Sequence, residues 1–147
     1  MERVARLWED RLTVIVVLQW LHVLFAIFWF GSQLYSVMVV DPQLARLVPA
    51  DAYANIVDAF RAGTPRLLTV VSSTGTVLLG FLRGLAGGVL DVAGSAYFYT
   101  WLTALVIGTF MVISIWTRGY GGRIPSPLWN SLFVVMFTLM IAMRFGY

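Results

Sequence analysis

The sequence predicts an all-α protein: a four-helix transmembrane bundle with one interfacial amphipathic helix between the first and second spans. Of its 147 residues, 60% are hydrophobic and only 12% are charged, and the mean hydropathy is +0.85. A soluble domain of this length would expose large apolar patches. Charged and turn-forming residues divide the chain into four apolar runs, each about long enough to cross a membrane. We therefore expect residues 1–147 to form a single integral membrane domain.

The first span is predicted at about residues 12–40, because no Asp, Glu, Lys or Arg occurs between Leu12 and Val40. The run exceeds the roughly 20 residues that a helix needs to cross the hydrocarbon core of a bilayer. It is also far longer than the apolar core of a secretory signal, so we expect a retained helix. Asp41-Pro42 is predicted to end this helix, since proline lacks an amide hydrogen and disfavours a helical conformation in the residue before it.

Residues 50–62 are predicted to form an amphipathic helix with an apolar and a polar side. The apolar side consists of Tyr53, Ile56, Val57 and Phe60, and the polar side of Asp51, Asn55, Asp58 and Arg61. Gly63 is expected to stop the helix. Two interpretations remain open: the helix lies on the bilayer or caps the bundle, or it docks on a partner protein.

The second span is predicted at about residues 65–83 and begins at a Thr-Pro pair, where threonine can cap a helix and proline fits the first turn. Because the apolar stretch is short, Arg66 and Arg83 are expected to extend toward the lipid headgroups. The glycine-rich residues 84–95 are expected to connect to the third span. Their apolar members could prolong the second helix by a turn.

The third span is predicted at about residues 96–117 and opens with a cluster of aromatic residues, as is common at a membrane interface. A turn rich in glycine and proline follows. The fourth span, at about residues 127–143, starts with another cap and proline and ends before Arg144. The orientation stays open, because the arginines divide five and five between the two sides of the membrane.

Several kinds of chemistry lack the residues they need. The chain has no cysteine and no lysine, which excludes disulfides, iron–sulfur clusters, thiolate metal sites and lysine Schiff bases. No carboxylate lies within a predicted span, so carboxylate pairs and carboxylate-bridged metal sites have no material there. The net charge of +3 gives no reason to expect nucleic acid, since arginines near helix ends suit phospholipid headgroups. Whether the protein is an enzyme stays open.

His22 is the single histidine and lies at membrane depth within the first span, where ionisable groups are costly and usually functional. At 100° per residue, Gln19, Trp29 and Gln33 fall within about 60° of it. We expect this face to point away from lipid, because polar side chains in contact with acyl chains lose their hydrogen bonds. One interpretation is that these side chains only bind neighbouring helices. The other is that His22 binds haem or a metal, or carries a proton, with the other three around the ligand.

The second span offers a surface of small residues. This surface consists of Thr69, Ser73, Thr76 and Gly80, with Ser72 beside it. Small side chains allow two helices in lipid to approach closely. We expect packing rather than a pore lining, because no charge accompanies the hydroxyl groups.

The fourth span carries Met136, Met140 and Met143 at i, i+4 and i+7. A thioether is a soft ligand for copper(I) and can be an axial ligand for haem. His22, Met136 and Met140 are therefore a candidate metal-binding set. Methionines at helical spacing in an apolar helix also arise from packing alone.

Residues 20–35, with the sequence WLHVLFAIFWFGSQLY, resemble the first helix of a broad group of bacterial membrane proteins. The group includes HemJ-type protoporphyrinogen oxidases and CopD-like copper-resistance membrane domains, and shares a W-x-x-H pattern followed by aromatic-Phe-Gly. Trp29-Phe30-Gly31 matches the second part, whereas a single residue, Leu21, separates Trp20 from His22 in this chain. The resemblance implies a helical bundle in the bacterial inner (cytoplasmic) membrane, and a role for His22 in binding tetrapyrrole. The essential lysine and additional histidines of HemJ-type enzymes have no counterpart in this chain.

One histidine per chain limits how a cofactor can be held. Two-histidine ligation of haem requires a homodimer or a larger membrane complex, whereas ligation by histidine and methionine does not. We expect a homodimer or a larger membrane complex, because one histidine leaves haem or copper short of a strong ligand and the small-residue surface of the second span suits close contact with another chain. The leading expectation is a small membrane protein that binds haem b, or less readily copper, in electron transfer or tetrapyrrole handling. The alternatives are a cofactor-free accessory subunit of a larger complex and, third, a channel or transporter.

Overall fold

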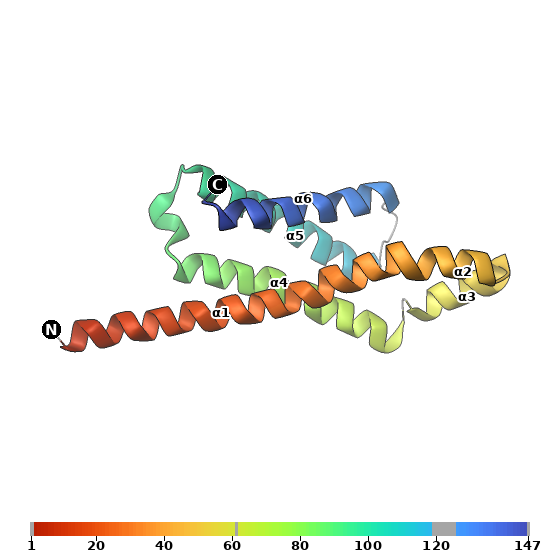
Figure 1. Ribbon diagram of the computed structural model, residues 1–147, viewed down its shortest axis with the longest axis horizontal. Helices are drawn as coiled ribbons and strands as arrows, with labels where there is room; N and C mark the ends of the chain where they lie inside the picture. Colours follow the sequence, from red (N-terminus) through yellow and green to blue (C-terminus); the bar gives the residue numbers. More distant parts are fainter. Residues whose placement is uncertain (1, 61, 119–125, 147) are drawn as a thin grey trace.

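The computed structural model describes residues 2–60, 62–118 and 126–146, and the regular elements of these residues are all helical. Figure 1 shows them in chain order. They are α1 (Glu2–Tyr35), the π-helical turn η1 (Ser36–Val40), α2 (Asp41–Leu47), α3 (Ala50–Phe60), α4 (Gly63–Ala86), the 3₁₀ turn η2 (Val89–Val92), α5 (Ala96–Arg118) and α6 (Ser126–Arg144). Four helical stretches among them are long and apolar enough to cross a membrane. The prediction of an all-α bundle with four spans is confirmed.

The first span does not end at Asp41-Pro42, where the sequence analysis placed its end. The helical path continues from α1 through η1 and α2, and the Asp41 amide donates to the Ser36 carbonyl across the π turn. A π turn pairs each amide with the carbonyl five residues back, which displaces the carbonyl that the proline ring would meet in a regular helix. Pro42 then occupies the first turn of α2, where the backbone amides have no partner within the helix, so its missing amide hydrogen costs no hydrogen bond.

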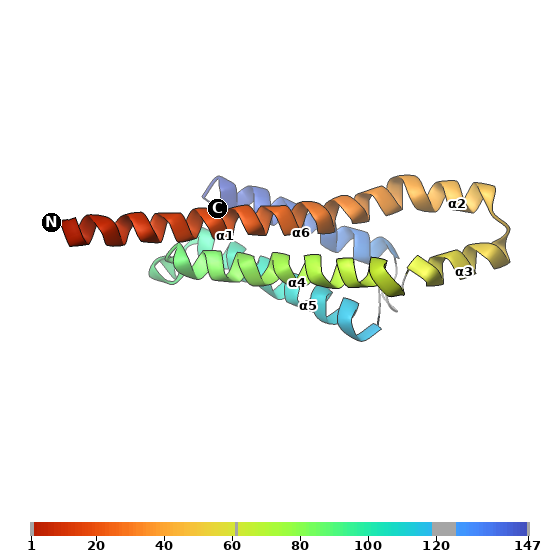
Figure 2. The ribbon, with the colours of Figure 1, turned by 90° about the horizontal axis from the view of Figure 1, so that it is seen from below.

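The helix ends instead at the next Xaa-Pro pair, Val48-Pro49. Val48 is extended, with φ −123° and ψ 135°, as expected for a residue before proline. The chain then turns back, so that α2 and α3 form a helical hairpin that extends past the ends of α5 and α6 (Figures 1 and 2).

The amphipathic pattern of residues 50–62 is expressed in α3, which ends at Phe60. Tyr53, Ile56 and Val57 are half-buried, whereas Asn55 and Asp58 are exposed. Gly63 lies at the start of α4 with φ 59°, so it makes the turn between the two helices. Arg61, predicted for the polar side, lies outside the described residues.

The remaining spans follow their predicted ranges closely. α4 extends to Ala86 and so includes one turn of the glycine-rich connection, while α5 and α6 begin and end within one residue of the expected positions. α1 packs most extensively against α4, α4 against α5, and α5 against α6. Figure 2 shows α1 and α4 lying side by side along most of the length of α4.

The contact between α1 and α4 uses the predicted small-residue surface. Ser72, Ser73 and Thr76 are buried in it, and their hydroxyl groups donate to backbone carbonyls of α4 itself. A Cβ added at Gly75 would lie 2.5 Å from the Phe25 ring. Helices approach this closely only where one of them lacks side-chain bulk. The hydroxyl groups therefore serve packing, as expected.

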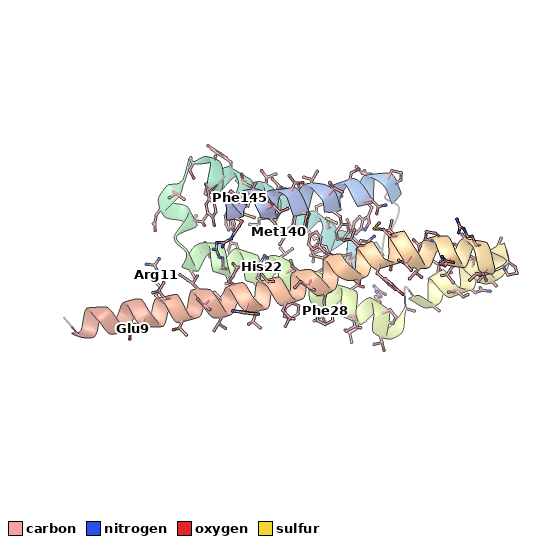
Figure 3. All side chains as sticks on the ribbon, viewed as in Figure 1. Glu9, Arg11, His22, Phe28, Met140 and Phe145 are labelled. Atoms are coloured by element: carbon pink, nitrogen blue, oxygen red, sulfur yellow. The ribbon has the colours of Figure 1, made fainter. Side chains whose placement is uncertain are left out.

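A mainly apolar core joins α1, α5 and α6. Trp29 and Phe30 of α1 pack edge-on against Phe133 of α6, with ring centroids 5.4 and 5.2 Å apart, and Met111 of α5 is fully buried beside them. The outer surface is also apolar: Phe28, for example, points away from the bundle in Figure 3 and is 63% exposed. Such a surface is suited to contact with lipid.

Candidate functional site

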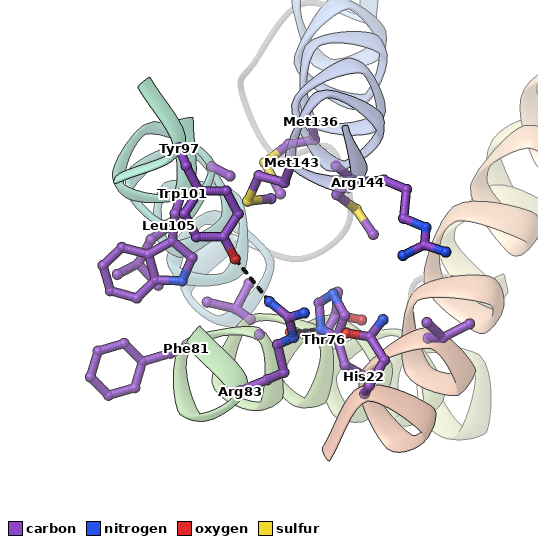
Figure 4. Close-up of a pocket in the computed structure, with 16 residues that line it drawn as sticks. His22, Thr76, Phe81, Arg83, Tyr97, Trp101, Leu105, Met136, Met143 and Arg144 are labelled. Carbon is purple, nitrogen blue, oxygen red and sulfur yellow. Dashed lines mark hydrogen bonds between the residues drawn. The ribbon is translucent and has the colours of Figure 1, made fainter. Parts of the chain in front are cut away.

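A cavity of about 400 Å³ lies between α1, α4, α5 and α6 (Figure 4). This volume falls within the range of small-molecule sites, roughly 300–1,000 Å³. Its walls are mostly apolar, with a few polar groups. The described residues that line it are Gln19, His22, Val23, Thr76, Val77, Gly80, Phe81, Arg83, Tyr97, Trp101, Ala104, Leu105, Met136, Met140, Met143 and Arg144.

His22 is held in one orientation at the wall of this cavity. Its Nδ1 atom lies 2.8 Å from the backbone carbonyl oxygen of Thr76. A carbonyl only accepts hydrogen bonds, so Nδ1 carries a proton and donates it. In the neutral ring, Nε2 then keeps its lone pair. Histidines that bind metals are typically oriented in this way, with the other ring nitrogen donating to a carbonyl or carboxylate.

Gly80 makes room for the imidazole. A Cβ added at this position would lie 2.8 Å from His22 Cε1 and 3.1 Å from Nδ1, closer than real carbon contacts allow. The ring therefore packs directly on the α4 backbone one turn beyond the carbonyl that it contacts. The same small-residue surface that brings α1 and α4 together thus positions the imidazole.

The four residues predicted to surround a cofactor do not all lie at the cavity. Gln19 and His22 line it, whereas Trp29 and Gln33 lie further along α1. Trp29 is completely buried in the aromatic core, and Gln33 is 5% exposed. Neither Trp29 Nε1 nor Gln33 Oε1 has a hydrogen-bond partner in the described residues. The assignment of these two side chains as cofactor neighbours stays a prediction, and the lining of the cavity gives it no support.

The methionines of α6 face the same cavity as His22. Met136, Met140 and Met143 all line it, and Figure 4 shows Met136 and Met143 across the cavity from His22. The described residues contain no group of three or more His, Cys, Asp and Glu side chains that could hold a metal. The cavity does bring one imidazole and three thioethers together, and such donors suit haem iron or copper(I).

Two arginines that the sequence analysis placed only at helix ends also line the cavity. Arg83 Nη1 donates to the Tyr97 hydroxyl at 2.8 Å, while its buried Nε atom has no hydrogen-bond partner among the residues that the structure describes. Arg144 extends from the end of α6 toward α1 in Figure 4. The described lining residues include no Asp or Glu. In the sequence, these arginines are recognisable only as basic residues that border apolar spans without acidic residues. That pattern does not tell whether an arginine faces a cavity or the lipid headgroups.

The fold and the cavity together define an integral membrane protein with a mostly apolar pocket between its spans, into which a few polar groups project. A scan of protein family models found no matching family, and searches of curated proteins and of solved structures found no match. The residues of the cavity therefore carry the argument for a function.

Proposed function

We propose that the protein binds haem b in this cavity, in electron transfer or tetrapyrrole handling, and that His22 Nε2 and a methionine of α6 would hold its iron. The main support is the hydrogen bond from His22 Nδ1 to the Thr76 carbonyl, because it leaves Nε2 available as a ligand. The cavity that His22 lines also contains three thioethers. The resemblance of the first helix to HemJ-type and CopD-like proteins supports the same ligand.

The residues of the cavity fit a planar, largely apolar macrocycle. Phe81, Trp101 and Leu105 offer apolar walls, and Phe81 and Trp101 stack with ring centroids 6.0 Å apart. When bound, haem supplies an iron that accepts and donates single electrons, and its potential depends on the axial ligands. The protein's part is to orient the imidazole through Thr76 and to exclude water with the apolar walls.

A second protomer is not required for this ligation. The homodimer was expected partly because one histidine leaves haem short of a ligand, and partly because the small-residue surface of α4 could contact another copy. Within one chain, methionines share the cavity with His22, and Ser73 and Thr76 of that surface are buried. We therefore propose one haem for each chain, whether the protein is a monomer or part of a larger membrane complex.

Copper(I) is the second candidate, because His22 and the methionines form a nitrogen and thioether donor set in one cavity. A cofactor-free accessory subunit is the remaining alternative. An absorption spectrum and a metal analysis of protein purified from its native membrane in mild detergent distinguish the three. A Soret band with one iron for each chain supports haem, and copper without a Soret band supports the metal site. If the purified protein contains no chromophore and no metal, the haem and copper proposals are both wrong and the accessory subunit is favoured.

A further inference from the structure

The arginines of the cavity lie toward one end of the helical bundle. Arg11 donates to the Ala86 carbonyl at the end of α4, and Arg83, Tyr97 and Arg144 line the cavity toward the same end of the bundle. His22 lies deeper, roughly 16 Å along α1 from Arg11 at 1.5 Å for each residue. The apolar part of the cavity is thus at membrane depth, and its arginines lie nearer the headgroups.

The arginines of the cavity have unused capacity to bind an anion. Among the described residues, the Arg83 side chain makes one hydrogen bond, to Tyr97, and its buried Nε has no partner. The Arg144 side chain makes no hydrogen bond or ion pair with a described residue, and it lines the cavity from an exposed position. No Asp or Glu is among the described residues of the lining. An anion bound beside the two guanidinium groups would offset their like charge.

We propose that Arg83 and Arg144 bind the acidic groups of an amphiphile whose apolar body occupies the deeper part of the cavity. Guanidinium groups bind carboxylates and phosphates with paired, charge-assisted hydrogen bonds. Two sources share this chemistry: the carboxylates of a tetrapyrrole and the phosphate of an anionic phospholipid. For the tetrapyrrole, the inference rests on the proposed function and makes the two arginines its carboxylate site.

The spacing along α4 allows one ligand to contact both His22, which lies beside Thr76, and Arg83. Arg83 follows Thr76 by seven positions, which corresponds to roughly 10 Å along the helix axis. Between these levels, Gly80 and Phe81 line the cavity and leave it apolar. A ligand bound through Nε2 of His22 therefore presents its acidic edge to Arg83 rather than to the bilayer interior.

The test uses the full-length protein in nanodiscs of zwitterionic phosphatidylcholine, titrated with haem and with haem dimethyl ester, in which both carboxylates are blocked. The wild type is expected to bind haem at least tenfold more tightly than the ester. Arg83→Gln and Arg144→Gln are each expected to weaken haem binding by about tenfold and to leave ester binding unchanged. Arg46→Gln, an exposed arginine on α2, is the matched control and should change neither.

The outcomes separate this inference from the proposed function. If both arginine variants bind haem as tightly as the wild type, the carboxylate site is wrong while haem binding stands. Arg144 makes no hydrogen bond within the described protein, so its variant tests the site even if Arg83→Gln misfolds.

If the wild type binds neither haem nor the ester, the proposed function fails. Binding of an anionic phospholipid then tests whether the two arginines form an anion site. Native mass spectrometry then compares the wild type with the double variant Arg83→Gln/Arg144→Gln in nanodiscs containing phosphatidylglycerol. Retention of phosphatidylglycerol by the wild type alone supports the phosphate source. Equal retention by both, or by neither, overturns the anion site.

Discussion

The imidazole of His22 and the backbone carbonyl of Thr76 are joined by a 2.8 Å hydrogen bond that connects α1 to α4 at membrane depth. The contact exists because Thr76 and Gly80 belong to a small-residue surface, so that the ring reaches the α4 backbone itself. The bond sets the tautomer of His22, so that Nε2 is the proton-free nitrogen of the neutral ring. Packing and site chemistry thus depend on the same few residues.

His22→Ala is expected to remove the bound chromophore or metal without preventing membrane insertion. Four apolar spans do not depend on one imidazole for insertion, whereas the proposed ligand does. The measurement is the absorption spectrum together with the metal content of the purified variant. Phe28→Ala, on the lipid-facing side of the same helix, is the control and should keep both. An unchanged spectrum in His22→Ala would show that His22 is not a ligand.

Gly80→Ala is expected to displace the imidazole, because its Cβ would lie 2.8 Å from His22 Cε1. We expect a loss of about 1–3 kcal/mol in stability, as for other overpacked sites, and a weaker affinity for the ligand. Thermal unfolding in detergent and haem titration measure the two effects. Gly31→Ala is the matched control, since a Cβ there meets nothing within 4 Å. It should be neutral or more stable by up to about 1 kcal/mol. Equal behaviour of the two variants would contradict the close contact.

Replacing the methionines of α6 one at a time with leucine is expected to identify the second axial ligand. Leucine conserves volume at a cost of less than about 1.5 kcal/mol, so each variant should fold. At the ligating position the haem spectrum and the reduction potential should change, because thioether ligation raises the potential. The other two substitutions serve as internal controls. If all three leave the spectrum unchanged, the methionines serve packing alone.

Cysteine substitution is expected to map the buried face of α1. The protein has no native cysteine, so each introduced thiol reports on one position. Cysteines at Ala26 and Gln33, which are 6% and 5% exposed, should resist a lipid-soluble label, and one at Ile27, which is 64% exposed, should react. Rapid labelling at Gln33 would mean that this face contacts lipid and that the bundle is arranged differently.

Truncation of Trp29 is expected to affect the fold rather than the ligand. Trp29 is completely buried and packs on Phe30 and Phe133, so Trp29→Ala should cost about 3–5 kcal/mol of stability. Protein that remains folded should bind haem with nearly the wild-type affinity, because Trp29 does not line the cavity. A selective loss of haem affinity at unchanged stability would restore the role that the sequence suggested for this residue.

The sequence by itself determined the membrane class, the four spans and the face of α1 that turns inward. These follow from local quantities: the length of an apolar run, and the position of polar side chains around a 3.6-residue period. His22 and the small-residue surface of α4 were also identifiable, because an ionisable group in lipid and a stripe of small side chains are each unusual enough to stand out.

Only the tertiary structure decided where the polar residues of that face are placed. His22, Arg83 and Met136 come from three helices and line one cavity. Trp29 and Gln33, on the same face as His22, are buried outside its lining, and Trp29 belongs to the aromatic core. A helical wheel gives the angular position of each side chain around the helix axis. It does not show where along that axis the neighbouring helices leave a cavity. Asp41-Pro42 is a local exception: a π turn let the helix continue there, an option that a rule based on the Xaa-Pro pair alone does not include.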